Sequence, residues 1–512
     1  MDVKDDGVLR PVAEKLGVPT DMLIFFGGEA FCLVCAILYY KYLPPSKVGV
    51  TVRHIVAMTI GVSVGFFSFG MQFNHVVAQS VLCYIAMMLL PQSVMHIGVF
   101  GLALTYLVTL HLYRAFMIPE DILYSIDVSG PLMIVTEKIS SLACSIYDGR
   151  QGNKDKLSDL QKRYMISKPP SALEYFSYLF YFQGVVVGPL SFYKDYIAYV
   201  DGTDISKRPE ENGVQNNNVY SGSNKFSPFY AVTYKLSVAL FWMGFHFTMK
   251  PIFPEILNCD PEFIRNNSFL YRFWYMIFSM LCCRAKYYVA FSLGDAICNA
   301  SGFGFNGYDC KGQPKWNLVT NVNVLGIEGA TSPKMYLDNW NIQTAVWLRL
   351  VCYDRIPVMK KFATFFLSAM WHGCYPGYYF TFIFANFVSE SARNARKKIR
   401  PYFQRTRNLQ VFYDVLTWLC THIVISYLVV PFTILHLGQT LTFYTYNMYG
   451  CLHVVVFASF FILPFIPAAQ SDNKNMSLKS NGTNSRHTVE CNNHLPDGTA
   501  NKSAKSNGIK MD

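Results

Sequence analysis

Charge is scarce in this chain, and the scarcity limits the class of protein that it can be. Lys, Arg, Asp and Glu make up 15% of the 512 residues, whereas a soluble domain contains roughly 25%. No polar stretch between the apolar runs is long enough for a soluble domain. The first twenty residues do not have the charged-then-apolar pattern of a signal peptide. An ordinary soluble protein is therefore excluded, and we expect the first apolar segment to direct targeting and to stay in the mature protein.

Two cofactor patterns are present only in fragments. Cys32 and Cys35 have the spacing of a redox or metal pair, but they lie in an apolar run without a partner pair. Gly302, Gly304 and Gly307 fit a dinucleotide fingerprint, but no strand precedes them and no βαβ unit surrounds them. We therefore expect no bound cofactor and no metal.

Apolar segments are abundant instead, since 52% of the residues are hydrophobic and 16% are aromatic. Many are long enough to cross about 30 Å of hydrocarbon. The candidates are 22–43, 55–71, 76–91, 95–113, 173–200, 229–249, 269–298, 362–388, 411–437 and 443–467, with 127–147 as an amphipathic or partly inserted helix. This pattern predicts an all-α polytopic membrane protein with about ten or eleven transmembrane or re-entrant helices that enclose an intramembrane reaction chamber.

The same pattern predicts three regions. A polar N-terminal segment covers residues 1–21, a membrane-embedded domain covers 22–467, and a tail rich in Asn, Ser and Lys covers 468–512. The tail contains few apolar residues, so we expect it to be disordered.

Basic residues give the predicted orientation. The formal net charge is +11, but the basic residues cluster in loops and not along one soluble face, which argues against nucleic-acid binding. Loops 148–170 and 393–407 carry the largest clusters, and the positive-inside rule places both in the cytosol. An even number of crossings must then separate them, which requires the short segment 340–352 not to cross the membrane.

A histidine lies inside apolar sequence at Trp371-His372-Gly373-Cys374-Tyr375-Pro376. An ionisable ring at membrane depth is costly, so such a residue usually faces a cavity and serves chemistry or transport. Histidine also suits proton transfer near neutral pH. Gly373 and Pro376 should break a straight helix, which at this depth requires support from protein or a water-filled cavity. The stretch predicts a polar reaction chamber, although a structural His372 bonded to a backbone carbonyl is the alternative.

Asn341 is the second candidate, and it lies in the short segment that we expect not to cross. A buried asparagine offers an acceptor and two donors, so it can hold a substrate hydroxyl or stabilise a developing oxyanion. The sequence does not choose between those two roles. The alternative is that Asn341 caps or pins a broken helix.

These two stretches together resemble a known family. Trp340-Asn341-Ile342-Gln343-Thr344, followed by Trp371-His372-Gly373-x-Tyr375-Pro376-Gly377-Tyr378, is similar to the paired signature of the membrane-bound O-acyltransferases. The similarity is closest to the lysophospholipid acyltransferases of types 1 and 2. Segments 127–134, 138–143, 184–196 and 302–308 support this branch, and the resemblance extends over roughly residues 20–465.

The resemblance implies an activity. It implies transfer of a fatty acyl chain from acyl-CoA to the free hydroxyl of a lysophospholipid in the endoplasmic reticulum membrane, with His372 as general base and Asn341 as the second catalytic residue. The expected acceptors are lysophosphatidylethanolamine, lysophosphatidylserine and lysophosphatidylcholine, and the expected donor is monounsaturated, such as oleoyl-CoA. Acyl-CoA is then a co-substrate, and the expected partners are acyl-CoA, the lysophospholipid and membrane lipid.

Three basic residues are candidates for substrate binding. Arg349, Lys360 and Lys361 lie near the predicted cytosolic approach, where they could contact the phosphates of CoA. The alternative is that they are solvated loop charges.

Three other functions stay open at this stage. The first keeps the family but changes the acceptor to a protein or a sterol. The second is a catalytically silent scaffold or lipid-binding protein, against which the intact Asn341 and His372 argue. The third is a non-enzymatic transporter whose histidine relays protons. Transporters often have paired halves with matching broken helices, and the first half of this chain has no counterpart of the break after His372.

Overall fold

The computed structural model of the chain describes residues 9–17, 19–117, 127–204, 227–309 and 312–467, and helices dominate these ranges. Strand pairing within them is limited to two isolated bridges, Tyr308 with Pro314 and Val322 with Trp340. The predicted tail, residues 468–512, and the first eight residues lie outside the described residues. The all-helical architecture is therefore confirmed for the described part of the chain.

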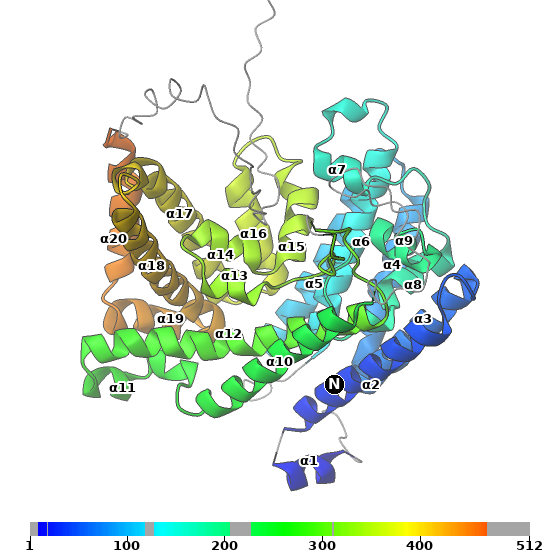
Figure 1. Cartoon of the computed structure of the whole chain (residues 1–512), viewed down its shortest axis with the longest axis horizontal. Coiled ribbons are helices and arrows are strands. Elements are labelled where there is room, and N and C mark those ends of the chain that lie inside the picture. The colour runs from blue at the N-terminus through cyan, green and yellow to red at the C-terminus, as the bar shows by residue number, and fades with distance from the viewer. Residues whose placement is uncertain (1–8, 18, 118–126, 205–226, 310–311, 468–512) are drawn as a thin grey trace, which may run out of the picture.

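The first half forms one packed group on the right of Figure 1. Its helices are α2 (Thr20–Tyr42), α3 (Val50–Phe69), α4 (Asn74–Leu89), α5 (Met95–Met117), α6 (Ser129–Gly149), α7 (Asp159–Tyr164), α8 (Ala172–Phe180) and α9 (Tyr193–Asp201). The short helix α1 (Arg10–Leu16) lies below α2 at the bottom of Figure 1.

The second half begins with the long pair α10 (Phe229–Met249) and α12 (Phe269–Ala300), which cross the lower part of Figure 1. The shorter helices are α11 (Pro261–Asn266), α13 (Val324–Glu328), α14 (Pro333–Asn339), α15 (Ile342–Leu348), α16 (Lys360–His372) and α19 (Leu437–Thr442). The remaining helices are α17 (Pro376–Lys398), α18 (Arg407–Ile434) and α20 (Cys451–Ile462). Helices α13 to α16 lie between the first group and the pair α17–α18 in Figure 1.

Local chemistry explains several helix starts. Ser158 begins α7 and Ser171 begins α8 with complete capping boxes, in which Gln161 and Glu174 bond back to the cap backbone. The Ser268 side chain accepts from Tyr271 N–H at the start of α12.

Five elements of the described chain are long and apolar enough to cross a membrane. They are Thr20–Tyr42, Val50–Leu89, Met95–Met117, Phe269–Ala300 and Arg407–Ile434, and the pair Leu437–Asn447 and Cys451–Phe465, bent by 83°, would make a sixth. The protein is thus a multi-pass membrane protein, but the predicted count of ten or eleven helices is not confirmed.

Breaks and mergers account for the smaller number. Predicted segments 55–71 and 76–91 belong to one continuous element, Val50–Leu89. Predicted segment 173–200 is not one helix, because α8 ends at Phe180 and α9 begins at Tyr193. A Cβ on Gly188 would lie 2.1 Å from the Cα of Gly184, so glycine is required for this close backbone turn.

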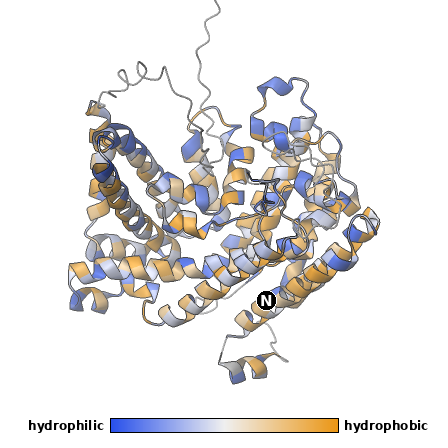
Figure 2. Ribbon diagram, viewed as in Figure 1, coloured by the Kyte–Doolittle hydropathy of each residue, from blue (hydrophilic) through white to orange (hydrophobic). Residues whose placement is uncertain are grey.

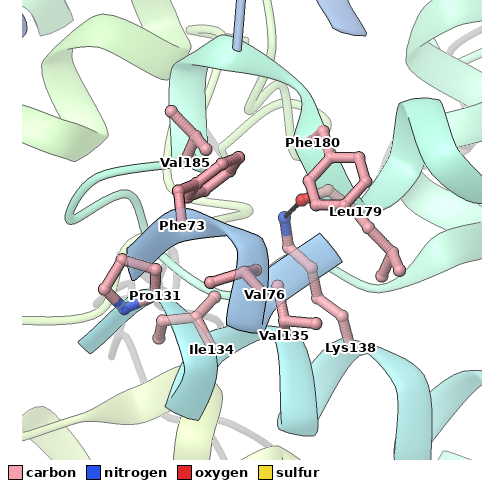
Figure 3. A pocket seen from close by; sticks show the side chains of 10 residues that line it. Phe73, Val76, Pro131, Ile134, Val135, Lys138, Leu179, Phe180 and Val185 are labelled. Carbon is pink, nitrogen blue, oxygen red and sulfur yellow. Dashed lines mark hydrogen bonds between the residues drawn. The ribbon is translucent and has the colours of Figure 1, made fainter. Parts of the chain in front are cut away.

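Helix α6 is enclosed on nearly every side, although its sequence predicted a partly inserted amphipathic helix. Glu137 and Lys138 are both 0% exposed. Lys138 Nζ donates to the carbonyls of Tyr178 and Leu179, at 3.2 Å each. Figure 3 shows this lysine reaching toward Leu179 among mostly apolar side chains. Burial here is compatible with charge because the ammonium group is bonded to backbone oxygens.

The short segment at 340–352 does not form a spanning helix. Helix α15 has seven residues, and a π-helical turn, Arg349–Tyr353, follows it. This length is too short to cross a bilayer. Helix α7, in the first basic loop, and the turn between α17 and α18, in the second, both lie toward the top of Figure 1, where Figure 2 is hydrophilic.

Candidate active site

The predicted break after His372 is present in the structure. His372 is the last residue of α16, and Gly373 leaves the helix with a φ of +146° that favours glycine. Pro376 then begins α17 at the position where a missing N–H costs no helical hydrogen bond. The histidine is therefore placed at a helix end, next to irregular backbone.

The backbone after the break crosses α18 closely. Gly377 N–H donates to the carbonyl of Leu435 at 2.9 Å. A Cβ on Gly377 would lie 2.0 Å from the carbonyl oxygen of Pro431, so only glycine allows this approach. The crossing fixes the start of α17 against the end of α18.

Aromatic side chains surround the imidazole of His372. Its ring stacks on Phe382, with centroids 5.2 Å apart, and meets Phe432 edge-on at 4.9 Å. The ring of Tyr378 lies 5.6 Å away. The ring of His372 is partly buried, and it makes no hydrogen bond to any described residue. Among the described residues, His372 is therefore not a structural histidine bonded to a backbone carbonyl.

Neighbouring groups hold the backbone on the N-terminal side of His372. His111, in α5, donates from Nε2 to the carbonyl of Trp371 at 3.1 Å. The indole of Trp371 donates to the carbonyl of Met133, in α6, also at 3.1 Å. Helices α5 and α6 therefore fix the end of α16, and sequence reasoning missed both contacts because they join residues far apart in the chain.

Asn341 precedes α15 in a left-handed conformation, with φ +51° and ψ +48°. Its side chain makes no capping bond to the helix, so the predicted alternative of a side-chain cap is wrong. Its Oδ1 accepts from Asn321 Nδ2 at 2.8 Å. Its Nδ2 makes no hydrogen bond to the described residues, and it is not among the fully buried polar atoms that lack a partner. The amide of Asn341 therefore offers a donor to its surroundings.

His372 and Asn341 lie on neighbouring elements. The link between them is aromatic, because Trp347 of α15 packs against Trp371 with ring centroids 5.8 Å apart. The helical rise places Asn341 about 9 Å along the axis from Trp347. No direct contact between Asn341 and His372 is present among the described residues.

The three basic candidates differ in their surroundings. Arg349 is 53% exposed, with its Nε 3.4 Å from an oxygen of Asp354. Lys361 Nζ lies 2.8 Å from an oxygen of Glu390. Lys360 Nζ lies 5.6 Å from the ring centroid of Tyr353. Lys361 is thus already paired with a carboxylate, and Arg349 is the most open of the ion-paired candidates.

Asn321 is a further site residue that sequence reasoning missed. It is 4% exposed and bonds to both Asn341 and Gln343. Its sequence neighbourhood carries no recognisable motif, and only the 20-residue return of the chain brings it to Asn341.

Comparisons show which known proteins the chain is similar to. The profile of the membrane-bound O-acyltransferase family matches residues 75–430, which include both Asn341 and His372. Membrane-bound glycerophospholipid O-acyltransferase 2 of Rattus norvegicus is 40% identical over 467 residues, covering 91% of this chain and 89% of the relative. Membrane-bound glycerophospholipid O-acyltransferase 1 of Homo sapiens is 39% identical over 92% of this chain and 95% of its own length. A lysophospholipid acyltransferase of Schizosaccharomyces pombe is 28% identical over 68% of this chain and 69% of its own.

Proposed function

Because the chain belongs to the membrane-bound O-acyltransferase family, we propose that it transfers a fatty acyl chain from acyl-CoA to the free hydroxyl of a lysophospholipid. The similar proteins of Rattus norvegicus and Homo sapiens are named as glycerophospholipid O-acyltransferases, and that of Schizosaccharomyces pombe is named as a lysophospholipid acyltransferase. The observation that carries the proposal is the imidazole of His372, without a hydrogen bond to the described residues, at a break between two helices.

The chemistry needs a base in that position. An alcohol is a weak nucleophile until its proton is removed as the new bond forms. Neutral His372 takes that proton while the hydroxyl oxygen attacks the thioester carbonyl. The C–S bond then breaks, and the proton passes from His372 to the departing thiolate of CoA. General-base help of this kind contributes about 10²–10⁴-fold in rate, and the step consumes no metal or cofactor.

The finer assignments follow the family branch. We propose lysophosphatidylethanolamine, lysophosphatidylserine or lysophosphatidylcholine as the acceptor, a monounsaturated donor such as oleoyl-CoA, and the endoplasmic reticulum as the membrane. The rings of Phe382, Phe432 and Tyr378 around His372 give an apolar setting that suits an acyl chain.

Arg349, Lys360 and Lys361 are proposed to attract the phosphates of CoA. Opposite charge at an entrance strengthens binding in a salt-dependent way. Neutralising Arg349 or Lys360 should raise the KM for acyl-CoA several-fold at low salt and leave the KM for the lysolipid unchanged. Neutralising Lys361 should have a smaller effect, because Glu390 already pairs with it.

The experiment that tests the function is a competition assay. Purified protein receives a mixture of lysolipids and a mixture of acyl-CoA donors, and mass spectrometry identifies the diacyl products. Parallel reactions replace the lysolipids with a sterol or a serine-containing peptide. The proposal predicts product only with lysophospholipid acceptors. Acylated sterol or peptide without acylated lysolipid would overturn it.

A further inference from the structure

The hydrogen bonds around Asn341 fix which end of its amide is free. The backbone N–H of Gln343, which can only donate, bonds to Asn321 Oδ1 at 3.0 Å. The other end of the Asn321 amide is therefore its NH₂ group. That group donates to Asn341 Oδ1 at 2.8 Å. The oxygen of Asn341 is thus turned toward Asn321, and its NH₂ group faces outward as a donor.

Asn321 is itself held firmly. Its carbonyl accepts from Ile342 N–H at 2.9 Å, and the next residue, Val322, forms a bridge with Trp340. The side chain of Gln343 donates to the carbonyls of Leu318 and Thr320, at 3.0 and 3.1 Å. Residues 318–322 are therefore bonded to Trp340, before Asn341, and to Ile342 and Gln343, after it.

A buried ion pair anchors that stretch to two long helices. Lys235, in α10, lies 2.7 Å from an oxygen of Asp295, in α12. The hydroxyl of Thr320 donates to the same carboxylate oxygen at 2.6 Å. Since Thr320 adjoins Asn321, the asparagine pair is joined to a rigid part of the fold.

We propose that Asn321 is a positioning residue that locks the amide of Asn341 with its NH₂ group toward the substrate. This proposal rests on the proposed function and deepens it. Because the oxygen of Asn341 is turned toward Asn321, the NH₂ group is the end of the amide that faces the substrate, and the proton of the attacking hydroxyl passes to His372. Asn341 instead donates to an oxygen, and the thioester carbonyl oxygen is the one that gains negative charge as the new C–O bond forms. Asn341 therefore acts on the acyl donor.

The sharpest test is Asn321→Asp. The carboxylate still accepts from Gln343 N–H, but it cannot donate to Asn341 Oδ1. The Asn341 amide should then turn its NH₂ group toward Asp and away from the substrate. Loss of one oxyanion donor costs about 10²–10³-fold in kcat in other enzymes, so we expect a fall of at least about 10²-fold with a KM change below about threefold. Asn321→Ala, which adds no buried charge, should lower kcat by about tenfold because the amide is free to rotate.

Asn323 supplies a matched control. It accepts from a backbone N–H, that of Gly326, and donates to the oxygen of Asn339, so it repeats the bonding of Asn321 two residues later. Unlike Asn321, it is exposed. Asn323→Asp should therefore keep kcat within about twofold of the wild type.

A double-mutant cycle separates positioning from a general role in folding. In the Asn341→Ala background no amide remains to be positioned, so Asn321→Ala should lower kcat no further. Wild-type kcat in folded Asn321→Ala, or multiplicative losses in the double variant, would overturn the proposal. Melting temperature and yield from membranes are measured for every variant. Absence of lysolipid acylation by the wild type would instead overturn the proposed function, and this is seen before any variant is made.

Discussion

The imidazole of His111 donates a 3.1 Å hydrogen bond to the backbone carbonyl of Trp371, the residue directly before His372. This bond joins α5 to the end of α16. It holds the peptide that positions the proposed base, although His111 itself is in the first half of the chain. His111 therefore holds the backbone next to His372 from 260 positions before Trp371.

Replacing His111 tests this control. His111→Phe removes the donor and leaves the buried carbonyl of Trp371 without it, a loss worth about 1–3 kcal/mol. We expect kcat to fall by about tenfold, because small misplacements of a catalytic group are costly. His111→Gln keeps a donor and should recover part of the rate. A folded His111→Phe enzyme with wild-type kcat would show that the bond does not position His372.

Gly373→Ala tests the break itself. Gly373 has a φ of +146°, and an added Cβ would lie 3.0 Å from Cε2 of Tyr378. The strained backbone should cost about 1–3 kcal/mol, seen as a lower melting temperature, and should displace His372 enough to reduce activity. Gly438→Ala is the control, since a Cβ there meets no atom within 4 Å. Equal melting temperatures and activities for the two variants would contradict the account.

Glu137→Gln tests a buried carboxylate. The side chain of Glu137 is 0% exposed, and the neighbours that stabilise its charged form are Thr344 and Lys138. Burying a charged carboxylate with so few partners is costly, so a neutral side chain of the same shape should leave the melting temperature unchanged or raise it. Acyl transfer should stay within about threefold of the wild type. A marked loss of stability would mean that the charge of Glu137 is needed.

Acidic pH should weaken the ion pair between Lys361, at the start of α16, and Glu390, in the C-terminal half of α17. Burial alone would raise the pKa of Glu390, but hydrogen bonds from Lys361 and Arg393 outweigh it and hold the pKa below its ordinary value of 4.5. A lowered carboxyl pKa in the folded protein adds stability above the ordinary value, and this is lost as the pH falls through the folded pKa. Melting curves from pH 6 to pH 3, an interval of about three units that brackets the ordinary carboxyl pKa, should therefore show a smaller acid loss for Glu390→Gln. A loss identical to that of the wild type would exclude this contribution.

Part of the architecture could be predicted from local sequence. Gly373 and Pro376 predicted the break after His372, and both act through their own backbone preferences. Apolar length predicted a multi-pass helical protein, since hydropathy is also a local property. The prediction of one helix over 173–200 is wrong, because the chain turns inside this apolar run between α8 and α9. There, tertiary packing and not hydropathy decides where a helix ends.

The contacts that orient the site could not be predicted in this way. His111 and Asn321 reach Trp371 and Asn341 only after the chain has folded. Neither residue is marked by a periodic hydrophobic pattern or by a recognised motif. The sequence predicts an amphipathic or partly inserted helix over 127–147, and charged residues are rarely fully buried. Glu137 and Lys138 are nevertheless both enclosed by neighbouring elements.

The most direct test of the central claim is the rate of product formation by His372→Ala. Wild type, His372→Ala and the control His75→Ala, whose ring bonds to Tyr106 in another part of the protein, are purified from membranes and compared by melting temperature. Each then receives saturating acyl-CoA and lysophospholipid. The account predicts that His372→Ala melts like the wild type and forms the diacyl product at least about 10²-fold more slowly, while His75→Ala retains activity. A folded His372→Ala protein that acylates lysophospholipid within a few-fold of the wild-type rate would contradict it.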